Sequence, residues 1–439
     1  MNQKLYLYPN GTKLDDTTQL VASTLITVIS LQGNRDAPVT DLTITGLTFS
    51  STRPTFMQQY SIVSAGDWAV YRGGAVTASN TVGLVVELCT FSSIGGNGVL
   101  LDGRNTRASL RFNEFVDVGD SAMVAVGETA GIDGYSEPRS SNFTSVIGNF
   151  VHEIGLIGKQ VSSWCQMLAV NSLIERNVML NQPRAAVSFN DGLGGGNVVR
   201  FNLAVNACRE TADHGPLNSW DRMPYIFPGP DGLPTMTPAW SNIYGNFFVH
   251  NGGMGYPIDH DDGSAFWRDE HNVLVYGGAK NFLGHDKTAS KNLYIFPDVK
   301  PSANTCVGDY GAQWPNAGYN ESYCNNTCLI YNASGGSSRL WAGVGALNAF
   351  AGCSSSSLSR TVMHTANNTY YVHSPVGGAP SIDCDSQLVN FTEWQQALGQ
   401  ERGSVVRDHL PSPSQVVAMA RDVLADASLL PERGRVHLS

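Results

Sequence analysis

Ionisable and aromatic side chains are concentrated in residues 209–225, RETADHGPLNSWDRMPY, although the whole chain is only 15% charged. Further acids stand on either side, Asp191 in NDGLGGG and the pair Asp261 and Asp262 in DHDDGS. Two carboxylates held close together can divide the work of a general acid and of a base or nucleophile. Aromatic rings beside them offer flat faces for binding. These segments are therefore the candidates for chemistry, provided that the fold brings them together.

The elements that must position these residues repeat along the chain. Short β-branched strands, typically followed by an asparagine and a second apolar pair, occur in LRFNEFVDV, VIGNFVHEI, LIERNVML, VVRFNLAV, IYGNFFVH and DEHNVLVY. The shorter spacings between these asparagines are about 24 to 28 residues, which fits neither helical repeats nor sandwich hairpins. The recurring asparagines are Asn113, Asn149, Asn177, Asn202, Asn246 and Asn272.

This repeat predicts an all-β chain folded as a single-domain, right-handed parallel β-helix with long loops on one face. Coils would stack about 4.8 Å apart, and the asparagines would form a hydrogen-bonded ladder. We expect coils over about residues 15–300, disulfide-braced loops and the last coils over 301–390, and a cap of short helices over 391–439. The alternative is a β-sandwich with asparagine-rich turns.

Coil geometry predicts which acids meet. Asp191, Asp213 and Asp261 each follow the ladder asparagine of their own coil by 11 to 15 residues, which places them on one side of successive coils. Carboxylates on adjacent coils would lie about 5 Å apart, as in a retaining glycosidase, whereas two coils would give the wider separation of an inverting pair. We predict Asp213 and Asp261 as the catalytic acids, with Asp262 in reserve.

A wider set of residues is predicted to bind the substrate around these acids. Structural roles compete for several of them, since Asp-Gly pairs favour turns, Arg209 and Glu210 can pair with charges across coils, and histidines can be satisfied within turns. The predicted binding residues are Asn190, Asp191, Arg209, Glu210, His214, Asn218, Trp220, Asp221, Arg222 and His260, with Trp68, Arg72, Lys159, Gln160 and His285 from segments that could wall the same groove.

Composition limits the partners and the compartment. The formal net charge of −10 and the lack of basic patches disfavour nucleic acid, and no apolar run is long enough to span a membrane. Eight cysteines and several Asn-x-Ser/Thr sequons favour an extracellular glycoprotein with disulfides, whose pairing the sequence leaves open. The start of the chain lacks an apolar signal region, and we expect that residues of the natural domain precede it.

The segments NDGLGGG, RETADHGPLNSWDR and DHDDGS, after an early TGLTF and GDWAVYRGGAV, resemble the pectin-lyase-like β-helix proteins and, within them, glycoside hydrolase family 141. The similarity covers roughly residues 1–300. It implies α-L-fucosidase or xylanase activity, with Asp213 and either Asp261 or Asp262 as catalytic acids. The chain departs from the Asp-Gly-Gly pattern of such hydrolases, since His214 follows Asp213.

The sequence therefore predicts a secreted, monomeric glycoside hydrolase that acts on a complex polysaccharide without a metal or other cofactor. One alternative is a polysaccharide lyase or uronate epimerase, in which Arg209, His214, His260 or Arg222 would supply the base and Ca²⁺ could take part. A second alternative is a non-catalytic carbohydrate-binding or cell-wall protein that uses the same aromatic groove.

Overall fold

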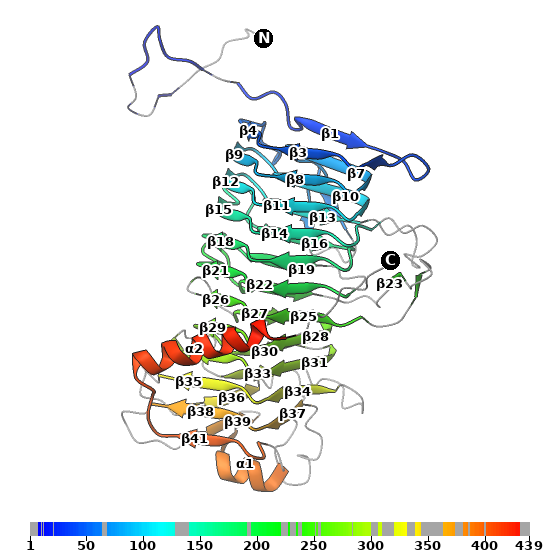
Figure 1. Cartoon of the computed structure of the whole chain (residues 1–439). Coiled ribbons are helices and arrows are strands. Elements are labelled where there is room, and N and C mark those ends of the chain that lie inside the picture. The colour runs from blue at the N-terminus through cyan, green and yellow to red at the C-terminus, as the bar shows by residue number, and fades with distance from the viewer. Residues whose placement is uncertain are drawn as a thin grey trace.

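The computed structural model is a parallel β-helix, as the repeat predicts, with coils stacked in chain order from β1 and β4 to β41 (Figure 1). It describes residues 8–430 except 10, 12, 21, 64–67, 128–139, 191–194, 221–226, 229–233, 236–238, 251, 253–255, 283, 300–305, 310–319, 332–338, 344–362, 374–380, 385–386 and 399–400. Each typical coil contributes one strand to each of three long sheets, here called A, B and C.

Sheet A contains fourteen strands. Its strands pair in parallel, except for β39 with β40, which are antiparallel. They are β1 (Ile29–Gln32), β2 (Val39–Thr40), β7 (Val76–Val82), β10 (Val99–Thr106), β13 (Met123–Val126), β16 (Trp164–Met167), β19 (Val187–Asn190), β22 (Leu217–Trp220), β27 (Ile258–His260), β30 (Ala279–Asn281), β33 (Val307–Asp309), β36 (Arg339–Gly343), β39 (Ser381–Cys384) and β40 (Gln387–Asn390).

Sheet B contains β3 (Thr43–Thr45), β8 (Val85–Glu87), β11 (Ser109–Arg111), β14 (Ser145–Ile147), β17 (Leu173–Glu175), β20 (Val198–Arg200), β25 (Ser241–Tyr244), β28 (Ala265–Glu270), β31 (His285–Ser290), β34 (Glu321–Cys324) and β37 (Met363–Ala366). Sheet C contains β4 (Thr48–Ser50), β9 (Thr90–Ile94), β12 (Glu114–Val118), β15 (Phe150–Ile154), β18 (Val178–Leu180), β21 (Leu203–Val205), β26 (Phe247–Val249), β29 (Val273–Val275), β32 (Leu293–Ile295), β35 (Thr327–Ile330), β38 (Thr369–Val372) and β41 (Val405–Arg407).

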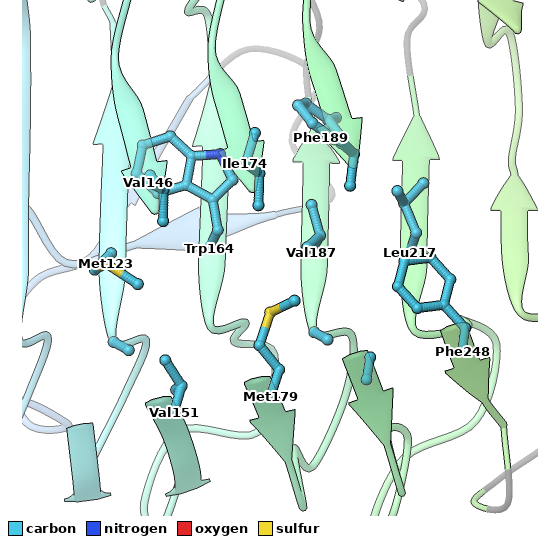
Figure 2. Close-up of a cluster of buried hydrophobic side chains, with 14 of the residues drawn as sticks. Met123, Val146, Val151, Trp164, Ile174, Met179, Val187, Phe189, Leu217 and Phe248 are labelled. Carbon is cyan, nitrogen blue, oxygen red and sulfur yellow. The ribbon is translucent and has the colours of Figure 1, made fainter. Parts of the chain in front are cut away.

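The core fills the inside of the coil with one apolar layer per turn. Figure 2 shows side chains from all three sheets meeting there, with Trp164 and Val187 from sheet A, Ile174 from sheet B, and Met179 and Phe248 from sheet C. Because successive strand residues point to opposite faces of a sheet, every second residue enters this core and the residues between them face outward.

The predicted asparagine ladder is confirmed at the corner between sheets B and C. The amide of Asn177 donates from Nδ2 to Oδ1 of Asn202 at 2.9 Å, and Asn202 donates in turn to Asn246 at 3.0 Å. Each corner consists of two residues, of which the first has a positive φ, and from Asn113 onward the second belongs to the ladder; Phe201 (φ 57°) before Asn202 is one example. The ladder also continues beyond the predicted residues, through Asn292 to Asn326.

The C-terminal segments only partly follow the expectation of an end cap. Helix α1 (Phe391–Leu398) does lie against the last strands of sheet A, β39 and β40. Helix α2 (Pro413–Ser428) instead packs along the side of the coil, where Val423 and Leu424 contact an apolar patch on sheet C. The helix buries its apolar face against this apolar strip on the outside of sheet C.

Smaller elements complete the description. Strands β5 (Ser61–Ile62) and β6 (Ala69–Val70) pair antiparallel, as do β23 (Phe227–Pro228) and β24 (Pro234–Thr235), and a short 3₁₀ helix covers Pro297–Val299. Cys306 and Cys328 form a disulfide that brackets the predicted braced loop. Within the described residues, no helix is long and apolar enough to cross a membrane.

Candidate active site

The outer face of sheet A carries a row of polar side chains on four neighbouring strands, β19, β22, β27 and β30. Val187, Leu217 and Ile258 enter the core, so their neighbours Ser188, Asn218 and Asp259 face outward. The sheet register places Ser188 opposite Asn218, Asn218 opposite Asp259, and Asp259 opposite Lys280. We call these four residues the polar row. It brings hydroxyl, amide, carboxylate and ammonium groups into line at the coil spacing of about 4.8 Å.

Asp213 and Asp261 meet beside this row. One carboxylate oxygen of each, together with a ring nitrogen of His214, lies within 4.8 Å of the other two. Asp261 directly follows β27, and its backbone N–H donates to the carbonyl of Ser219 at 2.8 Å, which fixes its position. Asp213 lies in the loop before β22 with a positive φ of 74°, and its side chain is 73% exposed. The structure thus brings together the two acids predicted to act as a pair.

Two basic side chains hold these carboxylates. The ammonium of Lys280 lies 2.6 Å from Oδ1 of Asp259 and 3.2 Å from Oδ1 of Asp261. The guanidinium of Arg184 lies 3.6 Å from Oδ2 of Asp213 and also donates to the carbonyl of Ala212 at 2.9 Å. Lys280 is largely buried and can therefore orient Asp261 with little competition from water.

Burial and neighbouring charges shift the pKa of Asp259. Burial raises the pKa most, the Lys280 ammonium opposes this, and the negative charges of Asp261 and Asp213 raise it further, which brings it to about 6. For Lys280 itself, burial lowers the pKa, but Asp259 and Asp261 raise it more, so the side chain is held in its charged form. The centre therefore contains a carboxyl group that titrates just below neutral pH.

His214 links the acids to an aromatic side chain from far earlier in the sequence. Its ring is stacked on Trp68 with 5.7 Å between centroids, and Arg184 lies 5.8 Å from the Trp68 ring centre. Burial, followed by the charges of Arg184 and Lys280, lowers the pKa of His214 well below its usual value, so the imidazole is neutral at pH 7. Asp213, His214 and Asp261 are close enough to hold a cation, although Lys280 and Arg184 already supply positive charge at both carboxylates.

Three of the predicted binding residues lie on the same outer face. Asn218 belongs to the polar row, and Asn190 and Trp220 pair with each other one row to the side. Asn190 and Asn218 are buried, and neither amide has a hydrogen-bond partner within the described part of the chain.

Two other predicted residues near β27 have different surroundings. His260 points into the coil, where its ring nitrogens lie 2.7 Å from the Ser219 hydroxyl and 2.9 Å from Asp269. This follows from alternation, because its neighbour Asp259 faces outward. Asp262 lies with Gly263 in the turn after β27, in keeping with the structural interpretation of that Asp-Gly pair.

Several charged residues of the predicted set bind one another. Arg209 forms ion pairs with Glu153 at 2.8 Å and with Glu210 at 3.4 Å, and Glu210 pairs with Lys159 at 2.7 Å. This is the pairing across coils that the sequence left open as the alternative to substrate binding. Gln160, next to this network, is exposed.

The remaining predicted residues do not join the acidic centre or cannot be placed. Arg72 binds Asp102 and donates to the carbonyl of Gly127 at 2.7 Å, on an earlier coil. His285 begins β31 of sheet B and contacts Asp286. Three predicted residues, Asp191, Asp221 and Arg222, lie outside the described residues.

Four residues of the centre were not among the predicted site residues, namely Asp259, Lys280, Arg184 and Ser188. Alternation places Asp259 on the outer face, and Lys280 belongs to the segment KNFLGHDK, which with His285 was expected to wall the groove, but neither residue was assigned to the acid pair. Arg184 gave no signal, because it lies in a turn between two unremarkable strands. Ser188 could have been found by alternation, because it lies two residues before Asn190 in β19.

Comparisons with known proteins give no family for this chain. No protein-family profile and no curated protein matches it. Among solved structures it is similar to one described as a glycoside hydrolase, with 15% identity over 62% of this chain and 50% of that one and a TM-score of 0.45.

Two further structures have similar scores. A structure of XylC with xylose shares 11% identity over 84% of this chain and 53% of that one, with a TM-score of 0.42. A GH136 lacto-N-biosidase from Eubacterium ramulus shares 10% over 88% and 59%, with a TM-score of 0.39. The chain thus spans between about half and three fifths of the length of these structures. The specific resemblance to glycoside hydrolase family 141 stays a prediction.

Proposed function

We propose that this protein is a glycoside hydrolase that cleaves its substrate with the carboxylates of Asp213 and Asp261. The observation that carries the proposal is their approach to within 4.8 Å on the outer face of a parallel β-helix. Carboxyl groups about 5 Å apart leave no room for a water molecule between acid and substrate, and they suit a mechanism through a covalent glycosyl-enzyme. We therefore expect retention of the anomeric configuration.

The contacts of the two acids support different roles. Asp261 is fixed by its backbone hydrogen bond to Ser219 and by the Lys280 ammonium, as a nucleophile that must attack from one direction requires. Asp213 is exposed at the edge of the centre, where it can protonate the departing sugar oxygen and later activate water. Asp259 holds Lys280 in place from the buried side.

Two of the four bases considered for the lyase and epimerase alternative are engaged in other contacts. Of the bases considered for it, Arg209 is engaged with Glu153 and Glu210, and His260 lies inside the coil with Asp269. Lys280 and Arg184 are each bound to carboxylates.

A disulfide between Cys306 and Cys328 supports an extracellular location for the enzyme.

A glycan panel tests the proposal. Xylans, fucosylated glycans, pectins and alginate are incubated with the wild type and with Asp213→Asn, with and without chelator. We expect new reducing ends without the ultraviolet absorbance of unsaturated sugars, and a loss of about 10²- to 10⁴-fold in the variant. Unsaturated products would contradict the proposal, and glycan binding without turnover would favour a binding protein.

The mechanism is tested on the glycan that is cleaved. Proton NMR of the first product formed should show the anomeric configuration of the substrate, and azide should restore turnover to Asp261→Gly as a glycosyl azide. Inversion at the anomeric carbon would instead require a water molecule between the acid pair and would overturn the assignment of Asp261 as nucleophile.

A further inference from the structure

A connected set of polar side chains lies inside the coil next to the turn that carries Asp261. The Ser219 hydroxyl lies 2.7 Å from Nδ1 of His260 and 2.8 Å from the hydroxyl of Ser264. The other ring nitrogen of His260, Nε2, lies 2.9 Å from Oδ2 of Asp269. All four residues are at most 5% exposed. We call Ser219, His260, Ser264 and Asp269 the interior network.

The positions that the interior network occupies are apolar on the preceding coil. Ser219 is in register with Phe189, and Asp269 is in register with Ile243. Both Phe189 and Ile243 belong to the apolar core. Polar groups at such positions stabilise a fold less than apolar side chains of similar size, because they must first lose their contacts with water. The network is therefore better explained by what it holds than by the packing of the coil.

The interior network is bonded to both ends of the turn that carries Asp261. The Ser219 carbonyl accepts the backbone N–H of Asp261 at 2.8 Å and the hydroxyl of Ser264, also at 2.8 Å. The N–H of Ser264 donates to the carbonyl of Asp261 at 3.0 Å, and the Lys287 ammonium donates to the carbonyl of Ser264 at 3.0 Å. The backbone of Asp261 is thus held from inside the coil, independently of the Lys280 contact with its side chain.

Each hydroxyl of the interior network has only one hydrogen to donate. Ser264 donates its hydrogen to the Ser219 carbonyl, so the bond between the two hydroxyls uses the hydrogen of Ser219. Ser219 then has none left for His260, and Nδ1 of the imidazole is the donor to Ser219. The orientation of His260 and the position of Ser264 are therefore set together.

We infer that Ser219, His260 and Ser264 are positioning residues, which hold the backbone of Asp261 in the place that the reaction requires. The inference rests on the proposed hydrolase function and on Asp261 as its nucleophile. An error of about 1 Å in the placement of a reacting group can cost about 10²-fold in rate. All three residues are buried, so they act through Asp261 rather than on the substrate.

The first test follows the first turnover of an activated aryl glycoside of the glycan that is cleaved, in which the phenol leaves without a general acid. Ser264→Ala should slow the release of the phenol about 10²-fold with the half-saturating concentration nearly unchanged, because the nucleophile is misplaced. Asp213→Asn should release the phenol at nearly the wild-type rate, because no proton is needed for this step. If Ser264→Ala forms the glycosyl-enzyme as fast as the wild type, the inference is overturned and the hydrolase stands.

Hydrogen exchange over residues 258–264 measures the anchor without any substrate. Ser264→Ala should exchange the Asp261 amide at least about tenfold faster than the wild type, because the carbonyl of Ser219 is no longer fixed by the turn, while β10 and β13 keep their protection. If the wild type cleaves no glycan, the hydrolase fails, and this measurement still decides whether the interior network holds the turn. Equal exchange in both proteins would refute the anchor.

The matched control is Ser141→Ala, which removes a fully buried hydroxyl that donates to the carbonyl of Gly103 at 2.9 Å on an earlier coil. It should leave both phenol release and exchange over residues 258–264 unchanged. Ser219→Ala, which keeps the carbonyl that binds Asp261 but removes the hydroxyl, is the second variant and should slow phenol release about tenfold. Equal slowing in Ser141→Ala would assign the effect to a general loss of stability and refute the positioning role.

Discussion

Lys280 is the residue on which the electrostatics of the centre depend. Its ammonium bridges Asp259 and Asp261, and so it keeps two carboxylates that are two residues apart in the chain close together despite their repulsion. Removing such a bridge inside a protein leaves uncompensated charge, which costs more than an exposed ion pair would. The position of Asp261, and with it the separation from Asp213, follows from this contact.

We predict that Asp259 makes the stability of the protein fall with rising pH. Its pKa is raised by burial from 3.8 to about 6 in the folded state, so between about pH 4 and pH 6 the folded protein binds a proton that the unfolded chain releases. The stability contributed by this proton is fully present below about pH 4 and is lost as the pH rises through 6, with a total of about 3 kcal/mol.

The measurement is the free energy of unfolding in urea at pH 4, 5, 6 and 7, for the wild type and for Asp259→Asn. The difference between the two proteins should change by about 3 kcal/mol across this range, with the variant gaining relative to the wild type as the pH rises. Parallel curves for the two proteins would show that Asp259 has an ordinary pKa in the folded state.

At the residue scale, the sequence located the acids better than it located their partners. The proximity of Asp213 and Asp261 could be predicted because the repeat gives each residue a position within its coil. The role of Lys280 depends on where a long flexible side chain comes to lie, and that of Arg184 on a turn whose course the repeat does not determine. His260 was predicted to bind the substrate, although alternation alone would have placed it inside the coil.

The ladder of asparagines is the element that joins one coil to the next at the corner between sheets B and C. Asn202 shows what each member contributes: its Nδ2 donates to the carbonyl of Ile174 at 2.9 Å and to Asn246, while its Oδ1 accepts from the backbone and side chain of Asn177. All these groups are buried. The ladder therefore satisfies polar atoms that the corner would otherwise leave unpaired.

We predict that Asn202→Ala lowers the free energy of unfolding by about 3 kcal/mol, because it removes several buried hydrogen bonds and leaves the Asn177 amides without an acceptor. Chemical denaturation measures the change. Asn206→Ala serves as the control, since its partly buried contact with Asn181 should cost less than about 1 kcal/mol. Equal losses in both variants would mean that the ladder contributes nothing beyond an ordinary side-chain hydrogen bond.

At the element scale, the sequence predicted the coils and the ladder because the pattern recurs many times. The position of helix α2 could not be predicted in the same way. Its sequence shows an apolar face but not the partner of that face, and both the end of the coil and the strip on sheet C that includes Leu293 and Ile295 were available. Strand β41 was missed because it follows α1, after the repeat has lost its regular spacing.

On the scale of the whole molecule, each coil contacts mainly its immediate neighbours, so a local change need not spread along the stack. The disulfide between Cys306, which directly precedes strand β33 of sheet A, and Cys328 in β35 of sheet C spans 22 residues. The disulfide lowers the conformational entropy of the unfolded chain over this segment and thereby stabilises the coils near the C-terminal end.

We predict that the double variant Cys306→Ala, Cys328→Ala destabilises these coils by about 3 kcal/mol, from the entropy of closing a loop of this length. Hydrogen exchange should show faster opening of strands β33, β34 and β35, with little change at β10 or β13. Cys324→Ala, which removes a free thiol, is the control. A uniform loss of protection over all coils would show that the stack unfolds as one cooperative unit.

The two-residue corner described above also determines where this protein can change over evolution. Every sheet B strand is followed after two residues by its sheet C strand, yet the spacing between successive ladder asparagines ranges from 20 to 44 residues. All of the variation in coil length is therefore accommodated on the other sides of the coil, which include the loops that flank the strands of sheet A. New segments can be inserted there while the corner that holds the coils in register stays unaltered.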